Sequence, residues 1–156
     1  MQLNKTIVNK PTQAYVGATW AALAIGVIGY LLGLWNATIQ FNEKGYYFAV
    51  FLLAMFAAVT LQKTIRDKHE GLPATGTFVI MCWVAMGSSV ALLVIGLFNA
   101  EMALSEKGFY SMAFVLCLFA VITAQKNTRD LMAAGTDVSA KAQADTDVNM
   151  SGSENS

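Results

Sequence analysis

The chain has 156 residues, of which 56% are hydrophobic and only 13% are charged, and its mean hydropathy is +0.51. Soluble domains carry about a quarter charged residues, so this composition excludes an ordinary soluble domain and indicates a protein whose solvent is lipid. The formal net charge is zero and no basic stripe is present, which excludes nucleic acid as a partner.

Four apolar runs follow one another along the chain, at about residues 15–35, 46–61, 77–98 and 109–124. None contains Asp, Glu, Lys, Arg or His, and with its flanks each approaches the ~20 residues that a helix needs to cross ~30 Å of hydrocarbon. Helices are expected because an unclosed strand would leave backbone groups unpaired in lipid. The first run is too long for a signal peptide. The sequence therefore predicts an all-α, polytopic membrane protein with four transmembrane helices.

The second pair of runs repeats the first. Residues 33–47 read GLWNATIQFNEKGYY and residues 96–110 read GLFNAEMALSEKGFY, and a gap-free alignment of 20–67 with 83–130 gives 20 identical pairs among 48. We therefore predict two parallel helix–turn–helix repeats, over 15–68 and 77–131. The segments outside them are an N-terminal segment (1–14), a linker (69–76) and a tail (132–156), which is expected to be disordered because its polar composition buries too little apolar surface.

The basic residues predict the orientation. Eight of them fall on one side of a four-span arrangement, and only Lys44 and Lys107 fall on the other. The positive-inside rule then places both termini and the 62–76 loop in the cytoplasm and both repeated turns outside. Because each repeat crosses twice, the two repeats share an orientation and are related by an axis along the membrane normal.

The repeated turn carries the same polar residues and glycines in both copies: Asn36, Glu43, Lys44, Gly45, Asn99, Glu106, Lys107 and Gly108. The asparagines are expected to end their helices in the left-handed conformation. Asn42 and Ser105 are expected to cap the next helices, with the glutamates against the helix dipole. The glycines would allow a close backbone approach or a tight entry, beside an aromatic belt at headgroup depth formed by Tyr46, Tyr47, Phe109 and Tyr110. The capping and turning of the helix pair explain this motif, and we call this explanation hairpin mechanics. The alternative is an outer vestibule in which the charged residues of both repeats converge on the pseudo-two-fold axis.

A second repeated motif follows each even-numbered run, as QKTIRD and QKNTRD. Its shared residues are Gln62, Lys63, Arg66, Asp67, Gln125, Lys126, Arg129 and Asp130. Helical spacing places Gln62 with Arg66, and Lys63 with Asp67, on common faces. A stop-transfer anchor explains the basic residues, but it does not explain why Gln and Asp recur. We therefore expect a specific contact, either with anionic phospholipid headgroups, with a membrane-protein partner, or between the two repeats.

Small residues form a stripe along the first helix, at Ala22, Gly26, Gly29 and Gly33. Such a stripe lets helix backbones approach closely in a membrane. The equivalent residues of the third helix are Ala85, Ser89, Leu92 and Gly96. We predict that the first and third helices pack together with Leu92 against Gly29, and homodimerisation through the same stripe is the alternative.

Several chemistries have no residues to support them. The single histidine, His69, lies outside the apolar runs, which excludes a bis-histidine haem. Cys82 and Cys117 lie inside apolar runs, as small buried hydrophobes do. No run contains an ionisable group for coupled transport, and no nucleophile–base pair or metal-ligand cluster can be assembled. We predict no cofactor, no metal and no catalytic residue, and hence a protein that is not an enzyme.

The repeated motifs carry a resemblance to a known family. YLLGLWNA, NEKGYYFAV and QKTIRDK in the first half, with VIGLFNA, SEKGFY and QKNTRD in the second, resemble the YiaA/YiaB inner-membrane family over about residues 15–131. The resemblance implies a multi-pass protein of a bacterial inner membrane with both ends cytoplasmic, and it implies no activity.

Two functional hypotheses remain open. The first is a non-enzymatic structural or modulatory membrane protein that acts through its tail and its QK-x2-RD face. The second is a small oligomeric channel or transporter with the EKG turns at its periplasmic mouth. The missing intramembrane charge favours the first.

Overall fold

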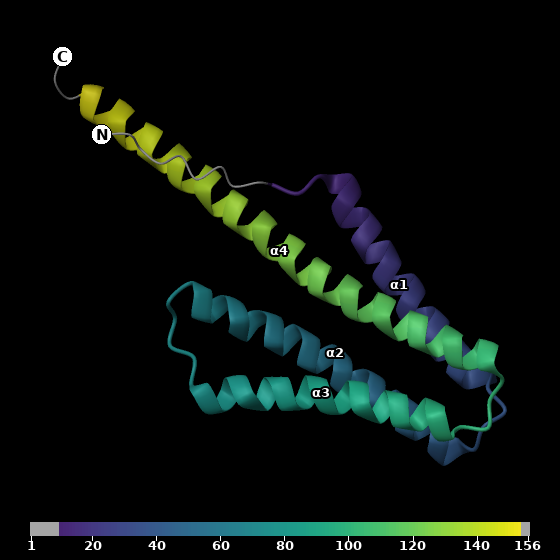
Figure 1. The fold of residues 1–156 in the computed structure, drawn as a ribbon. Coiled ribbons are helices and arrows are strands. Elements are labelled where there is room, and N and C mark those ends of the chain that lie inside the picture. Colours follow the sequence, from purple (N-terminus) through teal and green to yellow (C-terminus); the bar gives the residue numbers. More distant parts are fainter. Residues whose placement is uncertain (1–9, 154–156) are drawn as a thin grey trace.

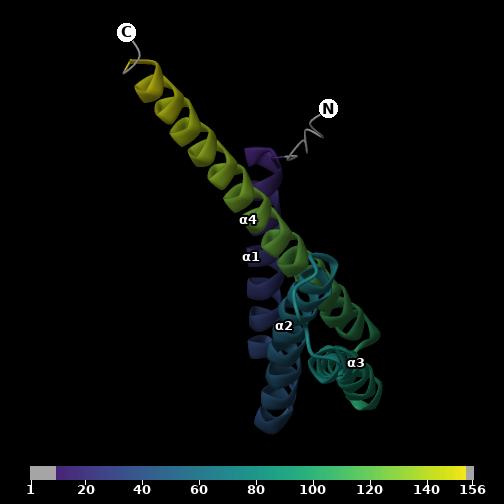
Figure 2. The same cartoon turned by 90° about the vertical axis from the view of Figure 1, so that its left-hand side faces the viewer.

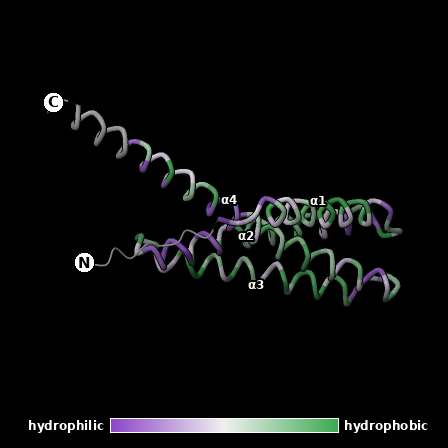
Figure 3. The backbone as a smooth tube through the Cα atoms, turned by 90° about the horizontal axis from the view of Figure 1, so that it is seen from above, coloured by the Kyte–Doolittle hydropathy of each residue, from purple (hydrophilic) through white to green (hydrophobic). Residues whose placement is uncertain are grey.

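The computed structural model describes residues 10–153, and within them all regular structure is helical. The helices are α1 (Gln13–Asn36), α2 (Phe41–His69), α3 (Gly76–Asn99) and α4 (Leu104–Ser153) (Figure 1). Each contains a stretch long and apolar enough to cross a membrane, and Figure 3 shows hydrophobic residues along most of the bundle. The prediction of an all-helical, four-span chain is confirmed.

The repeated asparagines end α1 and α3 by a side-chain bond. The Asn36 amide nitrogen donates to the Leu32 carbonyl and the Asn99 amide nitrogen to the Ile95 carbonyl, both at 2.9 Å. The chain then becomes extended at the next residue. The prediction that these asparagines adopt the left-handed conformation is therefore wrong, because no described residue other than glycine has a positive φ.

The even-numbered helices begin earlier than predicted. A Glu43 carboxylate oxygen accepts from the Gln40 backbone N–H at 2.9 Å, and Glu106 accepts from the Ala103 N–H at 3.1 Å. A glutamate bonds the backbone three residues earlier at a helix start, so α2 starts at Phe41 and α4 at Leu104. Asn42 and Ser105 consequently lie inside the first turn and are not the caps.

The helices pair across the repeats. α1 packs along α4, α3 packs along α2, and α2 and α4 meet at the centre, whereas α1 and α2 of the first repeat touch only weakly (Figures 1 and 2). Neither α1 with α3 nor α3 with α4 forms a packed pair. The predicted pairing of the first and third helices is therefore wrong, since each repeat supplies its first helix to the second helix of the other.

The small-residue stripe explains this exchange. A Cβ added at Gly33 would lie 2.7 Å from the Phe109 ring, and one at Gly96 would lie 2.7 Å from the Tyr46 ring. Phe109 and Tyr46 occupy equivalent positions at the starts of α4 and α2. In each half, an aromatic ring at this position therefore fills the space, or notch, left by the missing side chain of the equivalent glycine. The stripe of α1 thus faces α4 within the chain and does not face α3.

An aromatic cluster fills the core near the turns. Its rings are those of Tyr30, Tyr47, Phe51, Tyr110 and Phe114. Tyr47 and Tyr110, which are equivalent in the two repeats, stack with centroids 6.3 Å apart and planes 14° apart. The pseudo-two-fold axis therefore passes between them. Both are buried in protein, which corrects their expected place in a belt at the lipid headgroups.

The last helix runs far beyond the bundle. The sequence predicted a disordered tail over 132–156, whereas α4 continues to Ser153 (Figure 1). The segment has no proline and is rich in alanine, and it extends an existing helix, so the cost of nucleation is already met. Residues 135–143 are exposed, so this part of the extension lies outside the packed core. Residues 1–9 and 154–156 lie outside the described part of the chain.

Candidate functional site at the basic end

The bundle has two chemically distinct ends. The turn end holds the turns between α1 and α2 and between α3 and α4. The basic end holds the QKTIRD and QKNTRD motifs and the loop from α2 to α3. Every candidate residue from the sequence lies at one end or along the packed stripe.

Residues of the EKG turns form hydrogen bonds within their own helix–turn–helix unit. Lys44 Nζ donates to the Trp35 carbonyl at 2.8 Å, which satisfies an orphan group at the end of α1. Glu43 and Glu106 close the starts of α2 and α4. A Cβ at Gly45 or Gly108 would meet no atom within 4 Å, so neither glycine serves a close approach. These contacts agree with hairpin mechanics.

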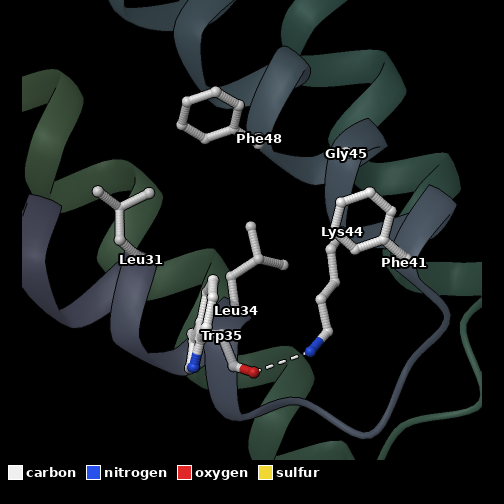
Figure 4. Close-up of a pocket in the computed structure, with 7 residues that line it drawn as sticks. All are labelled: Leu31, Leu34, Trp35, Phe41, Lys44, Gly45 and Phe48. Atoms are coloured by element: carbon white, nitrogen blue, oxygen red, sulfur yellow. Dashed lines mark hydrogen bonds between the residues drawn. The ribbon is translucent and has the colours of Figure 1, made fainter.

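An apolar groove, the turn-end groove, opens between α1 and α2 with a volume of about 680 Å³. Figure 4 shows its lining, which consists of Leu31, Leu34, Trp35, Phe41, Lys44, Gly45 and Phe48. It exists because the two helices of one repeat scarcely pack. Its one charged group, Lys44, is bonded to a backbone carbonyl, so the lining offers shape for lipid chains and little to select a ligand.

At the basic end both repeats form the same ion pair. Lys63 Nζ lies 3.8 Å from an Asp67 carboxylate oxygen, and Lys126 Nζ lies 3.4 Å from Asp130. The expectation that Lys63 and Asp67 share a face is confirmed. The lysines are 70% and 64% exposed, and exposed pairs of this kind contribute little to stability.

Glu70 joins the two repeats. One of its carboxylate oxygens accepts from Arg66 Nε at 2.6 Å and from a terminal nitrogen of Arg129 at 3.2 Å. The hydrogen bond from Arg66 is the main cause that lowers the pKa of Glu70 below its ordinary value, and Arg129 acts in the same direction. The carboxylate therefore stays charged between two guanidinium groups, on α2 and α4.

The comparison of repeats missed Glu70 because its counterpart is Ala133. The spacing of four between Arg66 and Glu70 was the available signal. The network between repeats that the sequence offered as one explanation is thus present in part, although the residue at its centre is not duplicated.

A buried polar layer lies just inside the basic end. The Asn127 amide nitrogen donates to Thr19 Oγ1 at 3.2 Å, and Thr64 Oγ1 lies 3.7 Å from Cys82 Sγ. Thr64 is equivalent to Asn127 and Cys82 to Thr19, so the same contact recurs with different chemistry. Sequence comparison missed it because neither position is identical between repeats. Such contacts hold transmembrane helices together.

The cleft at the basic end lies between α1, α2 and α4 and has a volume of about 480 Å³. We call it the basic-end cleft. Trp20 and Leu23 of α1, with Val59 and Val121 of α2 and α4, supply apolar lining. The polar lining comes from Lys63, Asp67, Gln125, Thr128 and Arg129.

The basic-end cleft collects only part of the predicted motif. It brings Lys63 and Asp67 of the first repeat to Gln125 and Arg129 of the second. Gln62, Arg66, Lys126 and Asp130 are not among its lining residues. The Gln125 side-chain oxygen is buried and has no hydrogen-bond partner. An unpaired buried acceptor is costly unless a donor reaches it.

Four membrane-length helices built from a duplicated two-helix unit define a polytopic membrane protein with an internal repeat. The sequence comparisons agree with this class. The chain belongs to the yiaA/B two helix domain family, whose model matches residues 15–67 and again residues 78–130. The family resemblance found from the motifs is confirmed.

Relatives occur in two bacteria. The inner membrane protein YiaA of Escherichia coli (strain K12) is 54% identical over 117 residues, which are 75% of this chain and 81% of the relative. The inner membrane protein YiaB of the same organism is 30% identical over 95 residues, 61% and 80% of the two chains. The uncharacterized membrane protein YubF of Bacillus subtilis (strain 168) is 38% identical over 60 residues, 38% and 69%. No solved structure matches the chain.

Proposed function

We propose that this chain is a non-enzymatic, structural or modulatory membrane protein that binds a phospholipid in the basic-end cleft. The observation that supports this is the cleft itself, which combines an apolar lining for acyl chains with a polar lining for a headgroup. Lipid-binding sites in membrane proteins combine these features because a phospholipid is amphipathic.

The orientation completes the proposal. With eight of the ten basic residues on the side of the termini, the positive-inside rule places the basic end in the cytoplasm, so the lipid comes from the cytoplasmic leaflet. Reporter fusions after Lys10 and Leu131 test this orientation. A periplasmic signal from either fusion contradicts it.

The alternative, a channel or transporter, receives less support. Near the turns the centre of the bundle is occupied by stacked rings. Of the four charged groups of the EKG turns, Glu43, Lys44 and Glu106 form hydrogen bonds with the backbone of their own hairpin. A conducting path needs polar groups that face a continuous opening. The basic-end cleft, in contrast, is lined by both apolar and polar side chains.

A cleft-filling variant tests lipid binding. Val59→Trp places a large ring in the basic-end cleft, and its matched control is Ile122→Trp, at the equivalent position of the second repeat, which does not line the cleft. Native mass spectrometry of protein purified in mild detergent is expected to show bound phospholipid for the parent and for Ile122→Trp. Val59→Trp should lose it while remaining folded by circular dichroism. Equal retention of lipid by both variants contradicts the proposal.

A further inference from the structure

Two arginines at the basic end share a single carboxylate oxygen. Arg66 Nε lies 2.6 Å from one oxygen of Glu70, and a terminal nitrogen of Arg129 lies 3.2 Å from the same oxygen. Among the residues that the structure describes, neither guanidinium group forms another ion pair, whereas the two lysines of the repeated motif each have an aspartate of their own. Two positive charges therefore face one negative charge, and one positive charge is left that no carboxylate balances.

Arg129 brings this unbalanced charge into the basic-end cleft. It lines the cleft, whereas Arg66 and Glu70 do not. A guanidinium group has five N–H donors, and the bond to Glu70 uses only one terminal nitrogen of Arg129. The remaining charged lining, Lys63 with Asp67, is a matched pair, and α1 contributes only apolar residues. The lining as a whole therefore carries a net positive charge.

We propose that the basic-end cleft selects an anionic phospholipid, whose headgroup carries a phosphodiester and no cation. The phosphate oxygens accept hydrogen bonds from the free donors of Arg129, since the planar fork of a guanidinium group matches two oxygens of one phosphate. The negative charge of the phosphate balances the positive charge that Glu70 leaves. This inference rests on the proposed function, because it names the headgroup of the lipid that the cleft binds.

A zwitterionic headgroup offers the same phosphate but a different balance of charge. Its ammonium cancels the charge of its own phosphate, so the positive charge shared by Arg66 and Arg129 stays unbalanced. The ammonium would also need an acceptor, and the one carboxylate that lines the cleft, Asp67, is already paired with Lys63. One basic residue near a membrane surface strengthens the attraction to anionic lipid about fivefold, and we expect a preference of this size for the anionic headgroup.

Glu70 competes with the lipid for the arginines. Glu70→Gln removes the only negative charge that faces Arg66 and Arg129, and it leaves a side chain of almost the same size. If the carboxylate served only to hold α2 to α4, its removal would not strengthen lipid binding. Under our proposal the substitution leaves a second positive charge unbalanced, so the retention of anionic lipid should increase.

The test compares three lipids with the same acyl chains: phosphatidylglycerol, phosphatidylcholine and phosphatidylethanolamine. The full-length protein is placed in nanodiscs that contain equal amounts of the three, and the lipids retained on it are quantified by native mass spectrometry. Phosphatidylglycerol is expected to exceed each of the other two by about fivefold. Equal retention of the three lipids, or a preference for a zwitterionic lipid, overturns this inference and leaves lipid binding in place. If Val59→Trp fails to change the retention of any lipid, both proposals are overturned.

The matched variants are Arg129→Gln and Lys126→Gln, which each remove one positive charge from α4, although only Arg129 lines the cleft. Arg129→Gln should abolish the preference for phosphatidylglycerol, Lys126→Gln should keep it, and Glu70→Gln should increase it. An equal loss in Arg129→Gln and Lys126→Gln would mean that anionic lipid gathers around the basic end without a site, which overturns the inference, as does a weaker preference in Glu70→Gln. The parent's preference among lipids needs no variant, so a variant that misfolds does not block the test.

Discussion

Replacing Gly26 by alanine is expected to destabilise the protein, whereas the same change one turn later should not. A Cβ at Gly26 would lie 2.7 Å from Cys117 Sγ, and Cys117 is 0% exposed, so any shift of its sulfur must displace other core atoms. A Cβ at Gly29 would meet only the Phe109 ring, at 3.9 Å, which is ordinary contact. The two substitutions therefore share their chemistry and their helix and differ in the space available.

The magnitudes follow from two opposing effects. Alanine in place of glycine favours a helix by about 0.8–1 kcal/mol, and overpacking a tight core costs about 1–3 kcal/mol. Gly29→Ala should thus be neutral or stabilising by up to about 1 kcal/mol. Gly26→Ala should be less stable than Gly29→Ala by roughly 1–3 kcal/mol, and Cys117→Ala should restore it by removing the sulfur.

Reversible unfolding in mixed micelles, followed by circular dichroism, measures these differences. Cys117→Ala is a conservative rescue because the first repeat has alanine, Ala54, at the equivalent position. If Gly26→Ala and Gly29→Ala change the free energy of unfolding equally, or if Cys117→Ala brings no recovery, then the pairing of α1 with α4 is not as described.

Two further predictions test the packing and the bridge between repeats. In a cysteine-free background, paired cysteines at Gly33 and Phe109 should cross-link on mild oxidation, and cysteines at Gly29 and Leu92 should not; the reverse pattern on non-reducing gels would restore the pairing of α1 with α3. Glu70 has a lowered pKa, so its contribution to stability is present above its ordinary pKa of 4.5 and is lost as the pH falls through the lowered value. Glu70→Gln should therefore reduce the loss of stability that the protein shows as the pH falls into the acid range. The reduction should be small, since this carboxylate is 44% exposed. If the free energy of unfolding depends on acid pH in the same way for the variant and the parent, the bridge from Glu70 to Arg66 and Arg129 does not form.

The spans and the duplication could be predicted because they depend on composition and identity alone. Apolar length determines which segments can cross a membrane, and identity over 48 aligned positions defines the repeat. The neighbours of each helix could not be predicted in this way, because a duplication makes α1 equivalent to α3 without deciding what either contacts. The deciding features are the rings of Tyr46 and Phe109, which need the notches at Gly96 and Gly33.

The residue types of the candidate site could be predicted from the sequence, but which of these residues lie together in the basic-end cleft could not. Gln62 and Gln125 are the same residue in the same motif, yet only Gln125 lines the basic-end cleft with an unpaired oxygen. Glu70 departs from the repeat altogether, since the equivalent residue is Ala133. Comparison of the repeats selects what the halves share, whereas the cleft and the bridge depend on where they differ.

The exchanged pairing of helices has a consequence for how such a chain arises. A chain with one two-helix unit cannot cover its own glycine notches, because the ring that fills them belongs to a second unit. It must therefore assemble from two copies, with the symmetry that relates Tyr47 to Tyr110 here. Joining the copies through residues 70–75 fixes their ratio at one to one and removes the concentration dependence of assembly. It also allows the two halves to differ in sequence, as they do at Glu70, whose equivalent residue is Ala133.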